Sequence, residues 1–162
     1  MATKKMESYL IADAVSNACE DLEQLASEIR DWYDNLPESL QGGDKGERLN
    51  ECADTLEQIQ SIDVPTCFDD SEDEDGEPNP TPARVEVWPL PRKASRSARR
   101  DYAVSLLSAV KDHVENVIAE KEAEHKADPE GWEHQTDAES FFDELDSAIG
   151  YAEEAEFPGM YG

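Results

Sequence analysis

The sequence predicts an all-α protein, an antiparallel bundle of about four helices with a long acidic and proline-rich loop at residues 64–94. Three observations predict it. Apolar residues recur at helical spacing in four stretches of the chain. Proline and glycine residues lie between these stretches. Only residues 84–88 alternate between apolar and polar side chains as a strand does. Each amphipathic stretch must bury its apolar face against another, and 162 residues suit a single helical domain, residues 1–162.

The longest helix is predicted over residues 8–36, because its apolar residues follow one another at alternating spacings of four and three. This heptad pattern comprises Ile11, Val15, Ala18, Leu22, Leu25, Ile29, Trp32 and Leu36. A second amphipathic helix is predicted over residues 47–62. The short glycine-rich connection between the two indicates an antiparallel hairpin.

Residues 64–94 do not follow a helical pattern. An acidic run at residues 69–77 is expected to form a mobile loop over 69–81, since its like charges repel. Prolines then exclude a helix. Residues 84–88 predict a short strand or an extended arm that packs on the helices, with the apolar side chains Val85, Val87, Trp88 and Leu90.

Two further helices are predicted over residues 97–125 and 137–155. The last one is expected to begin at a capping box formed by Thr136 and Glu139. The predicted core contains residues from all four helices: Leu22, Leu25, Ile29, Leu56, Leu106, Val110, Phe141 and Leu145.

Charge is the strongest functional signal in the chain, which has 40 acidic and 14 basic residues and a net charge of −26. A net charge of about 2–8 is enough to keep a small domain in solution. The excess negative charges repel one another in any folded form. We therefore expect a cationic partner that offsets this repulsion. Adaptation to high salt and a merely solvated surface are the alternative explanations.

The acidic side chains on helices are the candidate partner-binding residues. Those of the last helix and its flanks form the first candidate face: Asp137, Glu139, Asp143, Glu144, Asp146, Glu153, Glu154 and Glu156. Those of the first helix form a secondary face: Glu20, Glu23, Glu28 and Asp31. A helix rises about 1.5 Å per residue and B-DNA presents one charge per about 1.7 Å, so an acidic helix can occupy a groove made for nucleic acid.

One basic segment interrupts the acidic chain, with Arg92, Lys93, Arg96, Arg99 and Arg100. Its charges fall at a helix N-terminus, and the surrounding field repels phosphate, so direct nucleic-acid binding is not expected. We expect the segment to pair internally with the acidic run or the C-terminal acids. An acidic patch on a partner or a second subunit is the alternative.

No catalytic or metal-binding motif is recognisable, so an enzyme is not expected, and no cofactor or metal is predicted. The histidines His113, His125 and His134 match no nucleophile or zinc signature. A calcium loop centred on Gly76 would place Pro82 where a bidentate glutamate is required.

The three cysteines of the chain are widely spaced, which does not suit a disulfide framework. There is no apolar run near the roughly 20 residues that a membrane span needs. We therefore expect a cytoplasmic protein with reduced thiols that does not bind membranes.

Residues 28–41, continuing through 46–49 to 57, resemble a segment of small phage-encoded proteins. The pattern of the whole chain is also similar to phage-encoded DNA mimics that inhibit restriction or CRISPR nucleases. This resemblance implies an anti-defence protein acting in the host cytoplasm. It rests on composition, so it implies no individual residue roles.

The leading hypothesis is a non-enzymatic inhibitor that blocks a cationic nucleic-acid-binding protein, such as a nuclease, a Cas effector or a polymerase. The alternative is a structural or assembly protein, a scaffold or virion component, that oligomerises through the heptad seam of the first helix. The length of that helix leaves a homodimer open in either case.

Overall fold

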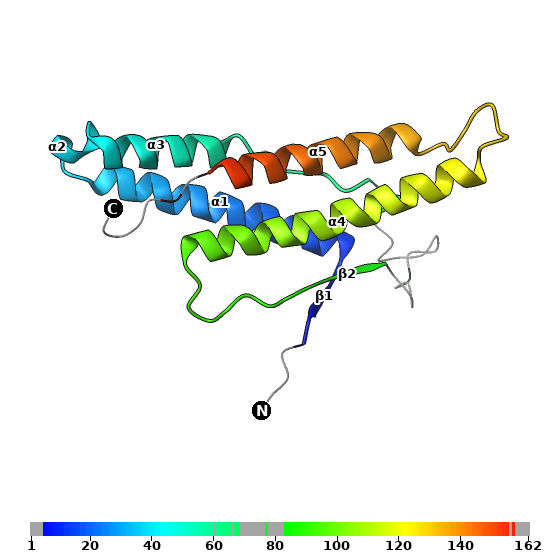
Figure 1. The fold of residues 1–162 in the computed structure, drawn as a ribbon, viewed down its shortest axis with the longest axis horizontal. Helices are drawn as coiled ribbons and strands as arrows, with labels where there is room; N and C mark the ends of the chain where they lie inside the picture. The colour runs from blue at the N-terminus through cyan, green and yellow to red at the C-terminus, as the bar shows by residue number, and fades with distance from the viewer. Residues whose placement is uncertain are drawn as a thin grey trace.

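The computed structural model describes residues 5–59, 61–65, 67–68, 77, 83–155 and 157. The described chain is mostly helical, as predicted, with a small two-stranded sheet in addition (Figure 1). In order, the elements are β1 (Glu7–Leu10), α1 (Ile11–Asn35), α2 (Glu38–Gln41), α3 (Asp44–Glu57), β2 (Arg84–Val87), α4 (Arg96–Glu124) and α5 (Gln135–Glu154).

The helices form two hairpins, α1 with α3 and α4 with α5, and the long helices α1 and α4 pack against each other. In Figure 1, α3 and α5 lie nearly in line along one side of the molecule. Their direct contact is slight compared with the contacts inside each hairpin. The predicted four-helix antiparallel bundle is therefore not confirmed, because α3 and α5 do not pack side by side along their lengths.

The predicted start of the first helix at residue 8 is wrong, because residues 7–10 form strand β1. This strand pairs antiparallel with β2, with Glu7 opposite Val87 and Tyr9 opposite Val85. The predicted strand at 84–88 therefore has a partner, which the sequence pattern did not reveal. Val85 and Val87 are buried as expected, whereas Trp88, expected to pack on the helices, is 62% exposed.

Two other predicted boundaries also differ from the structure. The second helix is α3, and it ends at Glu57 rather than residue 62, so that the described residues 58–59 and 61–65 are not helical. The last helix begins at Gln135, before the predicted capping box, and the Gln135 side chain donates to Glu139 at 2.7 Å. Helix α4 begins after Ser95, whose hydroxyl accepts a hydrogen bond from the Ala98 amide at 3.1 Å.

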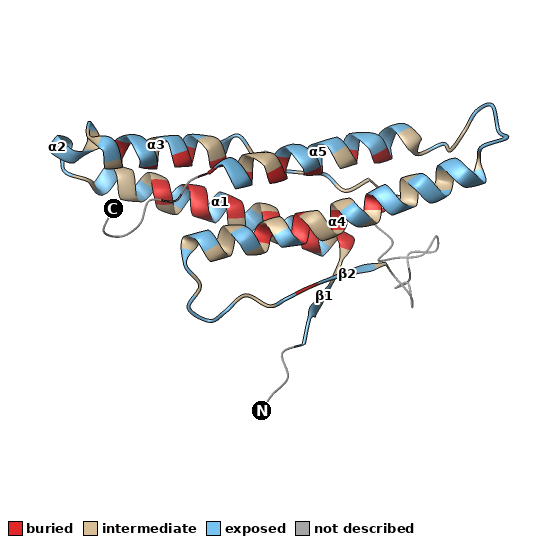
Figure 2. Cartoon of the chain, viewed as in Figure 1, coloured by how far each residue is buried: buried red, intermediate tan, exposed pale blue. Residues whose placement is uncertain are grey.

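The predicted core is confirmed, since all eight residues named for it are at most 2% exposed. Figure 2 shows the buried residues on the sides of the helices that face one another. On α1, every heptad residue from Ile11 to Ile29 is buried within this chain, and Trp32 and Leu36 are partly buried. The seam is therefore covered by α3 and α4 of the same molecule.

The acidic run predicted to be mobile, residues 69–81, lies outside the described residues except for Glu77. Just before it, Phe68 is buried, with its ring centroid 5.4 Å from that of Phe141 on α5. Within the described ranges, no helix combines the length and apolar character that crossing a membrane requires.

Leu25→Ala should lower the free energy of unfolding by about 2–5 kcal/mol, because Leu25 is fully buried and its truncation leaves a cavity. Urea denaturation measures the loss. Gln24→Ala on the exposed side of the same helix is the control and should change stability by less than about 0.5 kcal/mol. Equal stability of the two variants would contradict the packing of α1.

Candidate functional site

Helix α5 carries seven acidic side chains and no basic one. All seven are exposed and belong to the predicted first face, while the eighth member, Glu156, lies outside the described residues. Only one of them, Asp146, forms an ion pair with a described cation, through Lys111 of α4 at 2.7 Å. This hydrogen bond raises the pKa of Lys111. The other α5 carboxylates are left without a compensating charge among the described residues.

Helix α3 extends the acidic side of the molecule, because it lies nearly in line with α5 (Figure 1). Its charges are better neutralised. Arg30 of α1 contacts Asp54 at 2.8 Å and donates to both carboxylate oxygens of Glu57, at 3.0 and 3.1 Å. Arg30 also donates to Asn50 at 2.7 Å. The unneutralised charge is therefore concentrated on α5.

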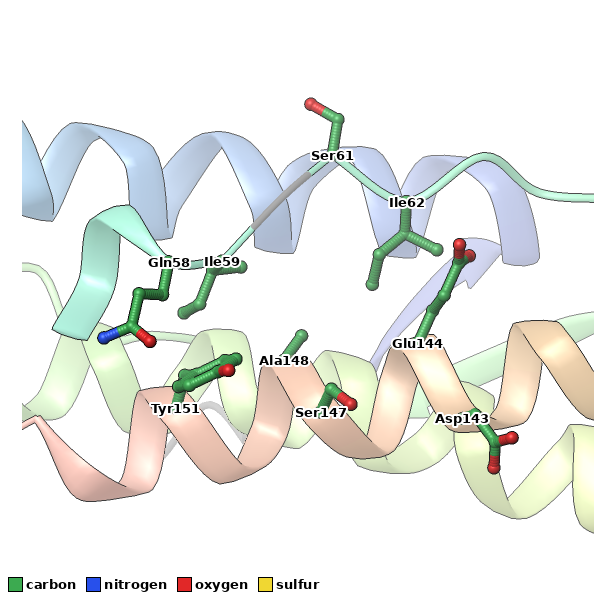
Figure 3. Close-up of a pocket in the computed structure, with 9 residues that line it drawn as sticks. All are labelled: Gln58, Ile59, Ser61, Ile62, Asp143, Glu144, Ser147, Ala148 and Tyr151. Atoms are coloured by element: carbon green, nitrogen blue, oxygen red, sulfur yellow. The ribbon is translucent and has the colours of Figure 1, made fainter.

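A groove with a volume of about 300 Å³ separates α5 from residues 58–59 and 61–62 (Figure 3). Its apolar walls are Ile59 and Ile62 on one side and Ala148 and Tyr151 on the other. Its polar lining comprises Gln58, Ser61, Asp143, Glu144 and Ser147. The groove therefore joins an apolar interior to two of the predicted acidic residues.

A second hollow, of about 430 Å³, lies between residues 63–65 and α5. It shares Glu144 with the first groove and adds the carboxylates of Asp63 and Asp137. The described residues nevertheless contain no group of three or more histidine, cysteine or carboxylate side chains placed to hold a metal ion. We call the first of these hollows, between α5 and residues 58–59 and 61–62, the acidic groove.

Sequence reasoning missed this groove because it placed Ile59 and Ile62 inside a helix. The helix ends at Glu57, so the two isoleucines instead form one wall of the groove opposite α5. Two apolar residues three positions apart can lie on one face of a helix. They can equally well lie on one side of a loop that packs against a neighbouring helix. Pro65, which cannot continue a helix, was the only nearby signal.

The secondary acidic face on α1 is not one surface in the structure. Glu20 and Asp31 are exposed on the outer side of the helix. Glu23 lines a separate hollow with Cys19 and Glu57, toward α3. Glu28 points toward α4, where both its carboxylate oxygens accept hydrogen bonds from Arg99, at 3.0 and 2.6 Å.

The basic segment divides into paired and unpaired cations. Arg99 binds Glu28, and Arg96 lies 3.6 Å from the same carboxylate with its guanidinium carbon 5.2 Å from the Trp32 ring centre. The pair with Arg99 holds the pKa of Glu28 below its usual range, although partial burial acts to raise it. Internal pairing is thus present for Arg96 and Arg99, but their partner is Glu28 of α1 and not the acidic run or the C-terminal acids that we expected.

Arg100 stabilises the C-terminal end of α5. It donates to the backbone oxygens of Ala152 and Ala155, both at 2.9 Å, and pairs with Asp101 at 2.7 Å. A cation beside the last carbonyls of a helix is favourable because these groups carry partial negative charge. Arg92 and Lys93 are exposed and form no ion pair with another described residue.

The three cysteines are free thiols, and each is at least partly buried. Burial raises the pKa of Cys52 to about 11, so this thiol stays protonated at neutral pH. Burial also raises the pKa of Cys19 and of Cys67. The thiols are therefore poorly suited to act as nucleophiles.

No family model matches this chain, and neither a curated protein nor a solved structure is similar to it. The functional argument therefore rests on the residues and their geometry.

Glu28→Gln should lower the free energy of unfolding by about 1 kcal/mol at pH 7, because it removes a charged partner of Arg99. Since the pKa of Glu28 is lowered in the folded state, its contribution is present above the unfolded value of about 4.3 and disappears as the pH falls through the folded value. Urea denaturation at pH 7 and pH 3 should show a larger difference from wild type at pH 7 than at pH 3.

Glu20→Gln is the matched control, since it removes the same charge from the exposed side of the same helix. Its stability should stay within about 0.5 kcal/mol of wild type at both pH values. If Glu28→Gln behaved like this control at pH 7, the pair with Arg99 would contribute nothing to stability.

Proposed function

We propose that this chain is a non-enzymatic acidic protein that binds a cationic nucleic-acid-binding protein and occupies the surface where that protein holds phosphates. The supporting observation is α5, with seven exposed carboxylates, no basic residue and a single ion pair. The resemblance to phage-encoded DNA mimics suggests a nuclease, a Cas effector or a polymerase of the host as the target.

The charge spacing along α5 supports the proposal quantitatively. The helix has 20 residues, which corresponds to a length of about 30 Å. Seven carboxylates over this length give about one charge per 4 Å, close to the roughly 3.4 Å between phosphates along one strand of B-DNA. A groove built for one nucleic-acid strand would therefore meet a similar mean density of negative charge along α5.

The placement of the cations favours the same function. Arg30, Arg99 and Arg100 are held between helices of the same chain, away from the outer side of α5. An approaching cationic groove therefore meets α5 carboxylates of which only Asp146 forms an ion pair with a described cation, although Arg48 of α3 lines a hollow with Glu154. Attraction of this kind accelerates association and weakens as salt is added.

The alternative, an assembly protein that oligomerises through the heptad seam, has less support. The seam residues from Ile11 to Ile29 are buried between helices of one chain, so they offer no apolar surface to a second copy. A homodimer remains a proposal that would need another surface, and self-repulsion between two highly acidic chains opposes it.

Proteins captured from a bacterial lysate by the immobilised chain should be enriched in DNA- or RNA-binding proteins, and added duplex DNA should release them. Mass spectrometry of the DNA-released fraction measures this. The chain itself should not retard duplex DNA in a gel at physiological salt. Retardation would instead indicate direct binding through the exposed cations Arg92 and Lys93, and release by salt but not by DNA would contradict mimicry.

Replacing three α5 carboxylates together, Asp143→Asn, Glu144→Gln and Asp146→Asn, should weaken binding to the captured target and leave the fold intact. Exposed carboxylates contribute little to stability. With fewer charges at the interface, fewer counterions are released on binding. The plot of log affinity against log salt concentration should therefore also have a shallower slope. Calorimetric titration at several salt concentrations measures both effects.

A matched triple change on the outer side of α1, Asp13→Asn, Glu20→Gln and Asp31→Asn, removes the same charge from exposed positions. It should weaken binding much less. Equal losses for the two triples would show that total charge, and not the α5 face, governs affinity.

A further inference from the structure

We propose that the acidic groove, between α5 and residues 58–59 and 61–62, is a receptor for an arginine side chain of the cationic partner. This inference rests on the proposed function and specifies which residue type of the partner is recognised. It starts from the combination of an apolar groove with an acidic end, which a merely acidic surface does not provide.

The apolar part of the groove fits the stem of a long cationic side chain. In Figure 3, Ile59 and Ile62 lie above Ala148 and Tyr151, with open space between the two rows. From Ala148 to Glu144 is one turn of α5, a rise of about 6 Å, which is close to the length of three methylene groups and the guanidinium carbon. A stem lying over Ala148 would therefore bring its charged end to Glu144.

The polar end of the groove is formed mainly by Glu144, which points toward Ile62 in Figure 3, with the Ser147 hydroxyl beside it. Asp143 also lines the groove, but its carboxylate points away from the two isoleucines in Figure 3. No described cation forms an ion pair with Asp143 or Glu144, so both carboxylates are open to an external partner. By contrast, the neighbouring Asp146 is already bound to Lys111.

This set of acceptors favours arginine over lysine. A guanidinium presents five donors in a planar fork that matches carboxylate oxygens in pairs, whereas an ammonium is a compact point charge. Guanidinium is also more weakly hydrated, so it enters a partly apolar groove at a lower desolvation cost. Charge alone would attract arginine and lysine side chains equally, so the preference for arginine comes from the groove.

The test compares hexaarginine with hexalysine, two peptides of equal charge, binding to the full chain at physiological salt. Hexaarginine should bind roughly tenfold more tightly, the effect of one charge-assisted bidentate contact. It should also shift the methyl NMR resonances of Ile59 and Ile62, whereas hexalysine should leave them nearly unchanged. Titration calorimetry and methyl spectra of the same samples give both readouts.

Ser147→Phe tests the groove without changing any charge, since Ser147 is exposed and lines it. The added ring fills the groove, so the preference for hexaarginine should disappear and hexalysine binding should remain. Ser16→Phe, at an exposed position on α1, is the matched control and should keep the preference. Glu144→Gln is the second variant, and it should weaken hexaarginine binding more than hexalysine binding, whether or not Ser147→Phe folds.

The outcomes separate this inference from the proposed function. If both peptides bind equally and the isoleucine methyl resonances do not move, the arginine receptor is wrong and the general attraction to cationic partners stands. The receptor is also wrong if Ser147→Phe folds and keeps the preference. If neither peptide binds, the proposed function fails together with the inference.

Discussion

The packing of α1 against α4 is the contact on which the other elements of the fold depend. Helix α3 packs on α1, α5 packs on α4, and the β1–β2 ribbon contacts both long helices. The buried residues of these helices are apolar, with Val15, Leu22, Leu107 and Val110 at most 1% exposed, and no described residue buries a charged side chain. Hydrophobic burial of this kind is the main favourable contribution that can oppose the self-repulsion of a chain with net charge −26.

Four of the 14 cations of the chain lie where helices meet. Arg30 joins α1 to α3, Arg99 joins α4 to α1, and Arg100 and Lys111 join α4 to α5. Each principal helix contact is thus crossed by at least one positive charge that reduces repulsion between neighbouring acidic helices. The same placement leaves the outer side of α5 unneutralised, so the arrangement that allows folding also produces the candidate binding face.

The helices and core could be predicted from the sequence because apolar spacing over several turns is a strong local signal, and Leu22, Leu106 and Phe141 are all buried. Strand β1 could not, because Glu7–Leu10 has no alternating pattern and is a strand only through its pairing with β2. The groove was missed for a related reason, since it depends on where α3 ends. The exposed acids of α5 were identified correctly as exposed, but their relation to an apolar groove required the tertiary structure.

The spacing of charges on α5 sets the conditions under which these residues act together. The carboxylates lie on average about 4 Å apart along the helix axis, with one interval of about 10 Å between Asp146 and Glu153. The Debye length is about 8 Å at physiological salt but about 3 Å at 1 M. At physiological salt the fields of neighbouring carboxylates therefore overlap from Asp137 to Asp146, and a cationic groove experiences a continuous negative surface there. At molar salt the carboxylates act singly. Within the acidic groove, the contacts of a bound side chain with Ile59, Ile62 and Tyr151 are apolar, so they do not depend on charge and are not screened. Long-range attraction would thus bring the partner to α5, and the groove would supply the part of the affinity that salt removes least.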